Sequence, residues 1–158
     1  MSHEARAREL HVELEAPPSR GGNYAPFTRV GELVYVSGST SAARPERAVT
    51  GRLGDGLEVE EGQRAARLAM ENCVANLRLA AGSLDRVRRI LRVTGYVNAT
   101  SDFARHPEVI DGASDFLVEL FGETGMHART AVGVASLPRN AAVEVELIAQ
   151  LTLENPER

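Results

Sequence analysis

The stretch from Ala142 to Leu153 reads Ala-Val-Glu-Val-Glu-Leu-Ile-Ala-Gln-Leu-Thr-Leu, with an apolar residue at every second position from Val143 onward. The positions between them hold Glu144, Glu146, Ile148, Gln150 and Thr152. Successive side chains of a β-strand point to opposite faces of its sheet, so this period of two is typical of a half-buried strand. We therefore expect a sheet with one apolar face against a core and a second face that is largely polar.

Four further strands are predicted upstream of this one. Ala128–Val134 is rich in small and β-branched residues and is joined to the last strand by a turn at Leu137–Asn140. Val87–Val97 is a β-branched run interrupted by Gly95, where we expect a bulge or a close approach of another backbone. Tyr24–Ser37 contains two β-branched and aromatic runs broken at Gly31-Glu32, which predicts a hairpin.

Two helices are predicted between these strands. Over Val59–Ala81, acidic residues crowd the first turn and Gly82 follows the last, which suits the helix dipole and a left-handed cap. Its apolar face follows a spacing of three and four: Ala66, Met70, Cys73, Leu77, Ala81 and Leu84. A second helix has Pro107 in its first turn and ends before Gly122. Its broad apolar face comprises Val109, Ile110, Ala113, Phe116, Leu117, Leu120 and Phe121.

The order of strands and helices is therefore ββαβαββ, which predicts an α+β fold with both helices on one face of a mixed sheet. Residues 1–20 are polar and end in Pro17-Pro18, so we interpret them as an N-terminal arm with a short helical or extended piece, and we expect the ordered domain to begin after it. Residues 21–158 form a single predicted domain, in which 39–56 is the longest loop.

The composition excludes several kinds of chemistry. All 18 basic residues are Arg, so an amine that forms a Schiff base and the lysine of a P-loop are both absent. Arg keeps its proton and serves to bind carboxylates or phosphates. A net charge of −4 and 4% aromatic residues argue against a surface for nucleic acid. The N-terminus has no apolar stretch and no long apolar run follows, so a cytoplasmic location and no membrane contact are expected.

Metal and thiol chemistry are not predicted either. The four histidines (His3, His11, His106 and His127) are not spaced as ligand pairs, so we expect no metal. Cys73 is the only cysteine and lies on the apolar face of the first long helix, which favours a packing role over a nucleophile. No Gly-x-Ser-x-Gly motif surrounds Ser37 and no paired His and Asp follow it in a recognisable arrangement, so a serine hydrolase is not expected. The basic cluster Arg86, Arg88, Arg89 and Arg92 is interpreted as a solvated strand edge.

Arg129 stands among small and β-branched residues, and its partner is open on these grounds alone. It could form a cross-strand ion pair with a carboxylate on the sheet, for which Glu144 on an expected neighbouring strand is available, or it could bind a ligand. Helices from one chain cover one face of the sheet, and Ile148, Ala131 and Gly133 are expected on the other. We therefore predict that a second copy of the chain covers that face.

The combined pattern resembles the YjgF/RidA family of reactive-intermediate (imine) deaminases. The resemblance spans residues 24–151 and is carried by Ala128-Arg129-Thr130, Leu137-Pro138, Val143-Glu144-Val145-Glu146, Ile148-Ala149, Gly22-Asn23-Tyr24, Val36-Ser37-Gly38, Leu84-Asp85-Arg86-Val87, Tyr96-Val97 and Asp102-Phe103. Within the family the chain is most similar to a longer branch, through Asp111-Gly-Ala-Ser114 and the run Phe121-Gly-Glu-Thr-Gly-Met-His-Ala-Arg129.

The resemblance implies a chorismate-mutase-like fold that assembles as a homotrimer with clefts between subunits. In these clefts Arg129 would hold the substrate carboxylate, Tyr24 would line the wall, and Ser37 would hydrogen-bond substrate or water. Glu144 would position the attacking water. A polar helix residue of the family aligns with either Asp111 or Ser114, and His127 would add a polar wall.

The implied reaction is hydrolysis of 2-imino or enamine acids to 2-oxo acids and ammonia, without metal or other cofactor. A protonated imine carbon is already electrophilic, so positioning and an oriented water suffice. The alternatives are a non-catalytic trimer that binds a carboxylate metabolite and a ribonuclease, the latter disfavoured by the acidic, aromatic-poor composition.

Overall fold

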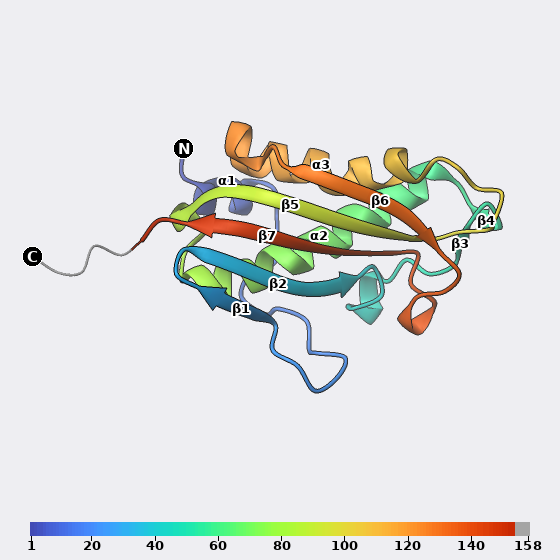
Figure 1. The fold of residues 1–158 in the computed structure, drawn as a ribbon, viewed down its shortest axis with the longest axis horizontal. Helices are drawn as coiled ribbons and strands as arrows, with labels where there is room; N and C mark the ends of the chain where they lie inside the picture. Colours follow the sequence, from blue (N-terminus) through green and yellow to red (C-terminus); the bar gives the residue numbers. More distant parts are fainter. Residues whose placement is uncertain (154–158) are drawn as a thin grey trace, which may run out of the picture.

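The computed structural model describes residues 1–153 and is a mixed sheet with two long helices on one face (Figure 1). The sheet has five strands in the order β1-β2-β7-β5-β6. Only β5 and β6 run parallel, and every other neighbouring pair is antiparallel. The strands are β1 (Phe27–Val30), β2 (Leu33–Thr40), β5 (Val87–Asn98), β6 (Ala128–Val134) and β7 (Val143–Leu151). The α+β class and the predicted order of long elements are confirmed.

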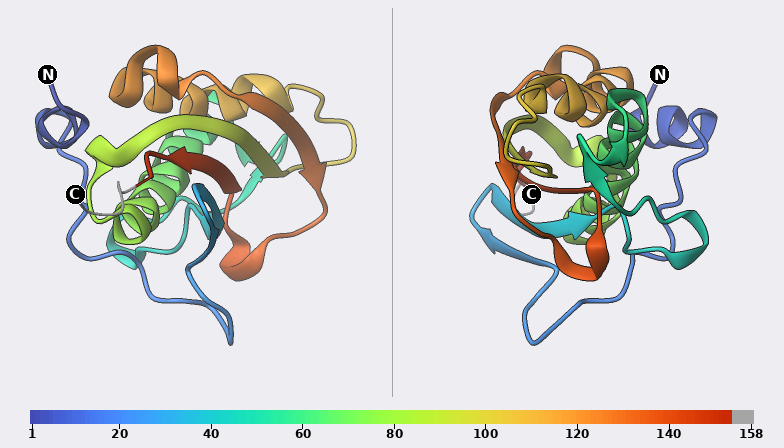
Figure 2. Two further views of the ribbon diagram at one scale, coloured as in Figure 1. Left: turned by 60° about the vertical axis from the view of Figure 1, so that its left-hand side comes forward. Right: turned by 90° about the vertical axis from the view of Figure 1, so that its right-hand side faces the viewer.

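Strand β7 lies in the middle of the sheet and shows the predicted alternation. Val143, Val145, Leu147, Ala149 and Leu151 are buried, whereas the four residues between them are partly exposed. The buried side chains meet the helices, and the others face the side of the sheet that no helix covers (Figure 2). The uncovered side is called the open face below. The hairpin is also confirmed, with Val30 paired to Leu33 across Gly31-Glu32.

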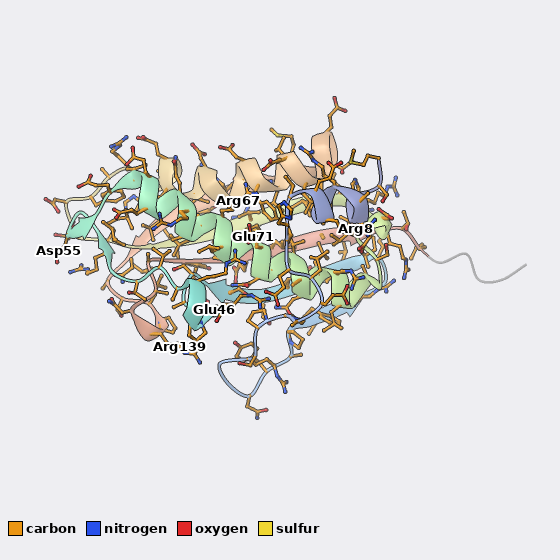
Figure 3. All side chains as sticks on the ribbon, turned by 180° about the vertical axis from the view of Figure 1, so that it is seen from behind. Arg8, Glu46, Asp55, Arg67, Glu71 and Arg139 are labelled. Carbon is orange, nitrogen blue, oxygen red and sulfur yellow. The ribbon has the colours of Figure 1, made fainter. Side chains whose placement is uncertain are left out.

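The helices form where the sequence predicts them, as α2 (Val59–Ala81) and α3 (His106–Phe121). At the start of α2 the Glu58 amide donates to Glu61 Oε2 at 2.7 Å, and at its end Gly82 has a φ of 79°, which favours glycine. On the outer surface of this layer, Arg67 pairs with Glu71 of its own helix and with Glu119 of α3, at 3.2 and 2.9 Å (Figure 3).

Two glycines allow close packing around α3. A Cβ at Gly112 would lie 2.1 Å from the backbone oxygen of Gln63, so the backbones of α2 and α3 are in close contact at this point. A Cβ at Gly95 of β5 would lie 2.5 Å from Cδ1 of Ile110. Neither possibility predicted at Gly95 occurs: the register irregularities of β5 lie nearer its start, and the group that approaches Gly95 closely is the Ile110 side chain rather than a backbone.

The N-terminal segment is more ordered than the sequence predicts. It contains helix α1 (His3–Glu9), which contacts α3 and buries Ala7 completely. Glu4 accepts hydrogen bonds from Arg78 Nε at 2.9 Å and from the Leu84 amide at 2.8 Å. The expectation that the ordered domain begins after residue 20 is therefore wrong. A seven-residue helix is too short to form by its own propensity and is held by these tertiary contacts.

Two smaller predictions also change. The expected loop 39–56 begins with the end of β2 and contains the short parallel pair β3 (Arg52–Leu53) and β4 (Gly56–Leu57), so part of it is regular. Arg88, Arg89 and Arg92 are exposed as predicted. Strand β6 pairs with β5 only from Arg92 onward, so Arg88 and Arg89 lie where β5 has a neighbouring strand on one side only, whereas Arg92 is flanked by both β6 and β7. Among residues 1–153, no helix is long and apolar enough to cross a membrane.

Candidate active site

Arg129 belongs to a cluster on the helix side of edge strand β6. In the register of the parallel pair it lies beside Val93, which points into the core. Its Nη1 donates to Asp111 Oδ1 at 2.8 Å and to Ser114 Oγ at 3.1 Å, and its Nη2 donates to the Pro107 carbonyl at 3.2 Å. The guanidinium is thereby fixed against the first turns of α3.

His127 joins the same cluster two residues before Arg129. Its Nδ1 lies 2.6 Å from the Gly125 carbonyl and its Nε2 lies 2.9 Å from Ser114 Oγ. Burial lowers the pKa of His127 below its usual value of 6.5; the Gly125 hydrogen bond opposes this shift and the charge of Arg129 adds to it. His127 is therefore a neutral imidazole at neutral pH.

A second group of predicted residues lines a hollow of about 540 Å³ near the N-terminal loop. Tyr24, Ser37 and Glu144 all contribute to its wall. Ser37 Oγ donates to the Ala25 carbonyl at 2.7 Å, and the Tyr24 hydroxyl accepts from the Gly21 amide at 3.2 Å. These bonds fix the loop before β1 against the end of β2.

Glu144 is a half-buried carboxylate in the wall of this hollow. Within the described residues its carboxylate has no hydrogen-bond or ion-pair partner, and burial together with nearby Glu146 raises its pKa above 4.5. A Cβ at Gly38 would lie 2.5 Å from Glu144 Oε1, so the glycine leaves room for the carboxylate. A half-buried, unpaired carboxylate of this kind can exchange a proton with a bound molecule.

Sequence reasoning missed three polar groups around Glu144. The Tyr96 hydroxyl donates to Glu146 Oε1 at 3.2 Å, and burial and the charge of Glu146 raise the pKa of Tyr96. Arg20 and Arg139 line the same hollow; Arg139 projects from the turn before β7 (Figure 3). Tyr96 and Glu146 each occupy a position that alternates with buried residues of its strand, which indicates the face that each side chain takes. Their contact with each other depends on the strand order, which alternation does not give.

The structure places the two groups on opposite faces of the sheet. Strand β5 separates β6 from β7, so the strand of Glu144 is not the neighbour of the strand of Arg129. Glu144 pairs in register with Tyr96 on the open face, whereas Arg129 lies beside Val93 on the helix side. The cross-strand ion pair considered for Arg129 is replaced by the contact with Asp111 of α3.

The same register corrects the expected composition of the open face. Ala131 and Gly133 share the helix side with Arg129: Ala131 packs on the core, and a Cβ at Gly133 would lie 2.4 Å from His106 Nε2. Thr130 and Val132 take their place on the open face, where the Arg92 Nη2 group donates to Thr130 Oγ1 at 2.8 Å. Ile148 lies there as predicted.

Cys73 has the packing role that the sequence predicts. Cys73 is fully buried, its thiol donates to the Val145 carbonyl at 3.3 Å, and burial raises its pKa to about 12. A thiol with so high a pKa is a poor nucleophile. Across residues 1–153 no three His, Cys, Asp or Glu side chains are grouped so that they could hold a metal ion.

Comparison with known proteins identifies the family. Residues 4–151 match the family model described as "YjgF/chorismate_mutase-like, putative endoribonuclease". The chain is 39% identical to Protein TCP17 of Trypanosoma cruzi, over 93% of this chain and 92% of that protein. It is 30% identical to the 2-iminobutanoate/2-iminopropanoate deaminase of Dermatophagoides farinae, over 87% and 92% of the two chains.

A solved structure supports the same assignment. Protein Atu1372 of Agrobacterium tumefaciens superimposes with a TM-score of 0.85 at 40% identity, covering 96% of this chain and 94% of that one. The two helices on one face of a mixed sheet agree with these matches. The chain belongs to the YjgF/RidA family and has its chorismate-mutase-like fold.

Proposed function

We propose that the chain hydrolyses 2-imino or enamine acids to 2-oxo acids and ammonia in clefts between the subunits of a homotrimer. The observation that carries this proposal is the separation of Arg129 from Glu144 on opposite faces of one sheet. One chain cannot bring both groups to one small substrate, whereas two adjacent copies can. The family relative from Dermatophagoides farinae that is named as an imine deaminase supports the reaction.

In such a cleft Arg129 binds the substrate carboxylate through its planar donors, a geometry that the ammonium of Lys does not reproduce. Asp111 shares the guanidinium, so the substrate carboxylate must compete with it. Tyr24 and Ser37 line the other wall, from the neighbouring copy.

Glu144 acts as the general base for the attacking water. The nitrogen of the imine is protonated, water adds to the electrophilic carbon, and the Glu144 carboxylate accepts the proton that water releases. Glu144 passes this proton to the nitrogen of the tetrahedral adduct and then takes the proton of the new hydroxyl as the C–N bond breaks, which releases ammonia and the 2-oxo acid. Ammonia takes that proton from Glu144 and leaves as ammonium, so the carboxylate is restored. The raised pKa of Glu144 brings it nearer neutrality and so suits a group that accepts and returns one proton.

Mixing two inactive variants tests both the reaction and the shared site. Arg129→Ala and Glu144→Gln are each expected to abolish turnover of an imine generated by an amino-acid oxidase and followed by its absorbance. When the two variants are produced together and assemble at random, about a quarter of the clefts combine two unaltered residues. Activity should therefore return to roughly that fraction of the unaltered protein.

The controls are each variant produced alone and the two mixed without exchange of subunits. Full activity of Arg129→Ala, or no recovery in mixed assemblies of two inactive variants, would contradict a shared cleft. If the unaltered protein accelerates decay of no imine but still binds 2-oxo acids, hydrolysis is wrong and the binding trimer is the better description.

A further inference from the structure

We infer that Ser114 is a nucleophilic serine, with His127 as its base, able to take the acyl group of an activated carboxylic ester. All the groups involved come from α3, the turn after it and β6 of one chain. The inference therefore requires no second subunit and does not depend on the proposed deaminase.

The direction of each hydrogen bond at His127 follows from the Gly125 carbonyl, which can only accept, and from the neutral state of the imidazole. The Gly125 carbonyl can only accept, so His127 Nδ1 carries the ring hydrogen in the 2.6 Å contact. In the neutral imidazole Nε2 is then an acceptor, and the Ser114 hydroxyl must donate to it across 2.9 Å. A serine that donates to a histidine whose other nitrogen is held by an acceptor is the arrangement that activates a nucleophile.

Arg129 adds a positive charge on the oxygen itself. Its Nη1 donates to Ser114 Oγ at 3.1 Å, so the oxygen accepts from a guanidinium while it donates to the imidazole. This hydrogen bond stabilises the negative charge that grows on Oγ as the proton moves to His127. Burial of the ring and the charge of Arg129 lower the pKa of His127, so its Nε2 is unprotonated and can accept a hydrogen bond, while both effects make the imidazole a weaker base.

The Ser114 side chain is partly exposed, and no known motif of a nucleophilic serine surrounds it. His127 is partly exposed as well. Ser114 lies within helix α3 and outside any Gly-x-Ser-x-Gly turn, so no motif in the sequence marks it as a nucleophile. The pair is visible only because the turn after α3 brings His127 back beside the helix.

The chemical step balances without a further reactant. Ser114 Oγ forms a bond to the carbonyl carbon of the ester as its proton passes to His127 Nε2. The bond from that carbon to the leaving oxygen breaks, and the departing alcohol takes the proton from His127. Water then attacks the acyl-serine by the same route and restores the hydroxyl.

Covalent labelling tests the inference. The full-length protein is incubated with an alkyl fluorophosphonate, which forms a stable Oγ–P bond with an activated serine and releases fluoride. Intact-mass and peptide measurements should show one adduct per chain, on Ser114. Ser114→Ala should remove it, and His127→Gln should slow labelling by about a hundredfold, because general-base assistance is lost.

Ser83→Ala is the matched control, because the Ser83 hydroxyl also takes part in a hydrogen bond but accepts it from the Asp85 amide, and the nearby His3 ring contacts the Leu84 carbonyl instead. It should label like the unaltered protein, and circular dichroism should show that all variants are folded. No adduct on the folded unaltered protein, or equal labelling of Ser114→Ala, would overturn the inference. Imine hydrolysis is measured separately, so either assignment can fail without the other.

Discussion

At the scale of single residues, the arginine expected to bind a substrate carboxylate already donates to a carboxylate of its own chain. The Arg129 side chain is 22% exposed and that of Asp111 is 48% exposed, so the pair is accessible to solvent on one side. Exposed ion pairs of this kind contribute little to stability and can exchange partners readily. Asp111 thus acts at this position as an internal competitor for the guanidinium.

Removal of this competitor should tighten substrate binding. We expect Asp111→Asn to lower the KM for a 2-imino acid by about two- to fivefold, the equivalent of an exposed ion pair. Asp115→Asn on the same helix, which has no contact with Arg129, is the control. A higher KM for Asp111→Asn would show instead that the aspartate orients the arginine for the substrate.

The raised pKa of Glu144 makes a contribution to stability that depends on pH. Between the usual value of 4.5 and the raised one, the folded protein holds a proton that the unfolded chain has released, so stability falls as pH rises through this window. Above it, Glu144→Gln should be more stable than the unaltered protein by about 0.5 kcal/mol, allowing for solvent screening. Below pH 4.5 the difference should vanish.

Thermal unfolding of both proteins as a function of pH measures this effect, with Glu123→Gln, an exposed glutamate, as the control. A stability gain for Glu144→Gln that persists unchanged at low pH would mean that removal of charge is not its cause.

At the scale of elements, the fold depends on how closely α2 and α3 approach. Gly112→Ala places a Cβ 2.1 Å from a backbone oxygen that cannot move without shifting α2. We expect it to lower the free energy of unfolding by about 2–4 kcal/mol, measured with denaturant. Gly62→Ala is the matched control, because its Cβ would lie 3.0 Å from the side chains of Leu53 and Val109, which can adjust.

The control substitution should cost less than about 1 kcal/mol, since alanine also favours the helix. Equal stability of the two variants would contradict the backbone contact between the helices.

At the scale of the whole molecule, the open face of the sheet carries apolar side chains that are partly exposed in one chain. Tyr35 is 46% exposed and Val132 is 40% exposed, and Ile148 lies between their strands. If this face is the trimer contact, Val132→Arg should convert an assembly of three times 17.0 kDa into single chains, as measured by sedimentation.

Val118→Arg is the control for this measurement. Val118 is 37% exposed, but it lies on α3 on the other side of the molecule. Its substitution should leave the mass unchanged. A mass of 17.0 kDa for the unaltered protein would contradict the trimer and, with it, the shared cleft.

The long helices and strands, and which of their residues are buried, could be predicted from the amino-acid sequence alone. Caps and apolar periodicity are local, so α2, the hairpin and the alternation of β7 were predictable from neighbouring residues. Helix α1 was not, because its stability comes from distant partners such as Arg78. The resemblance to a family supplied the candidate residues, but not their contacts.

The spatial arrangement of the candidate residues became visible in the three-dimensional structure and not before. Alternation fixes a side chain relative to its own strand, whereas strand order depends on pairing between distant segments. The insertion of β5 between β6 and β7 separates Arg129 from Glu144, and the turn after α3 returns His127 to Ser114. Both results are long-range, so no local pattern in the chain could have contained them.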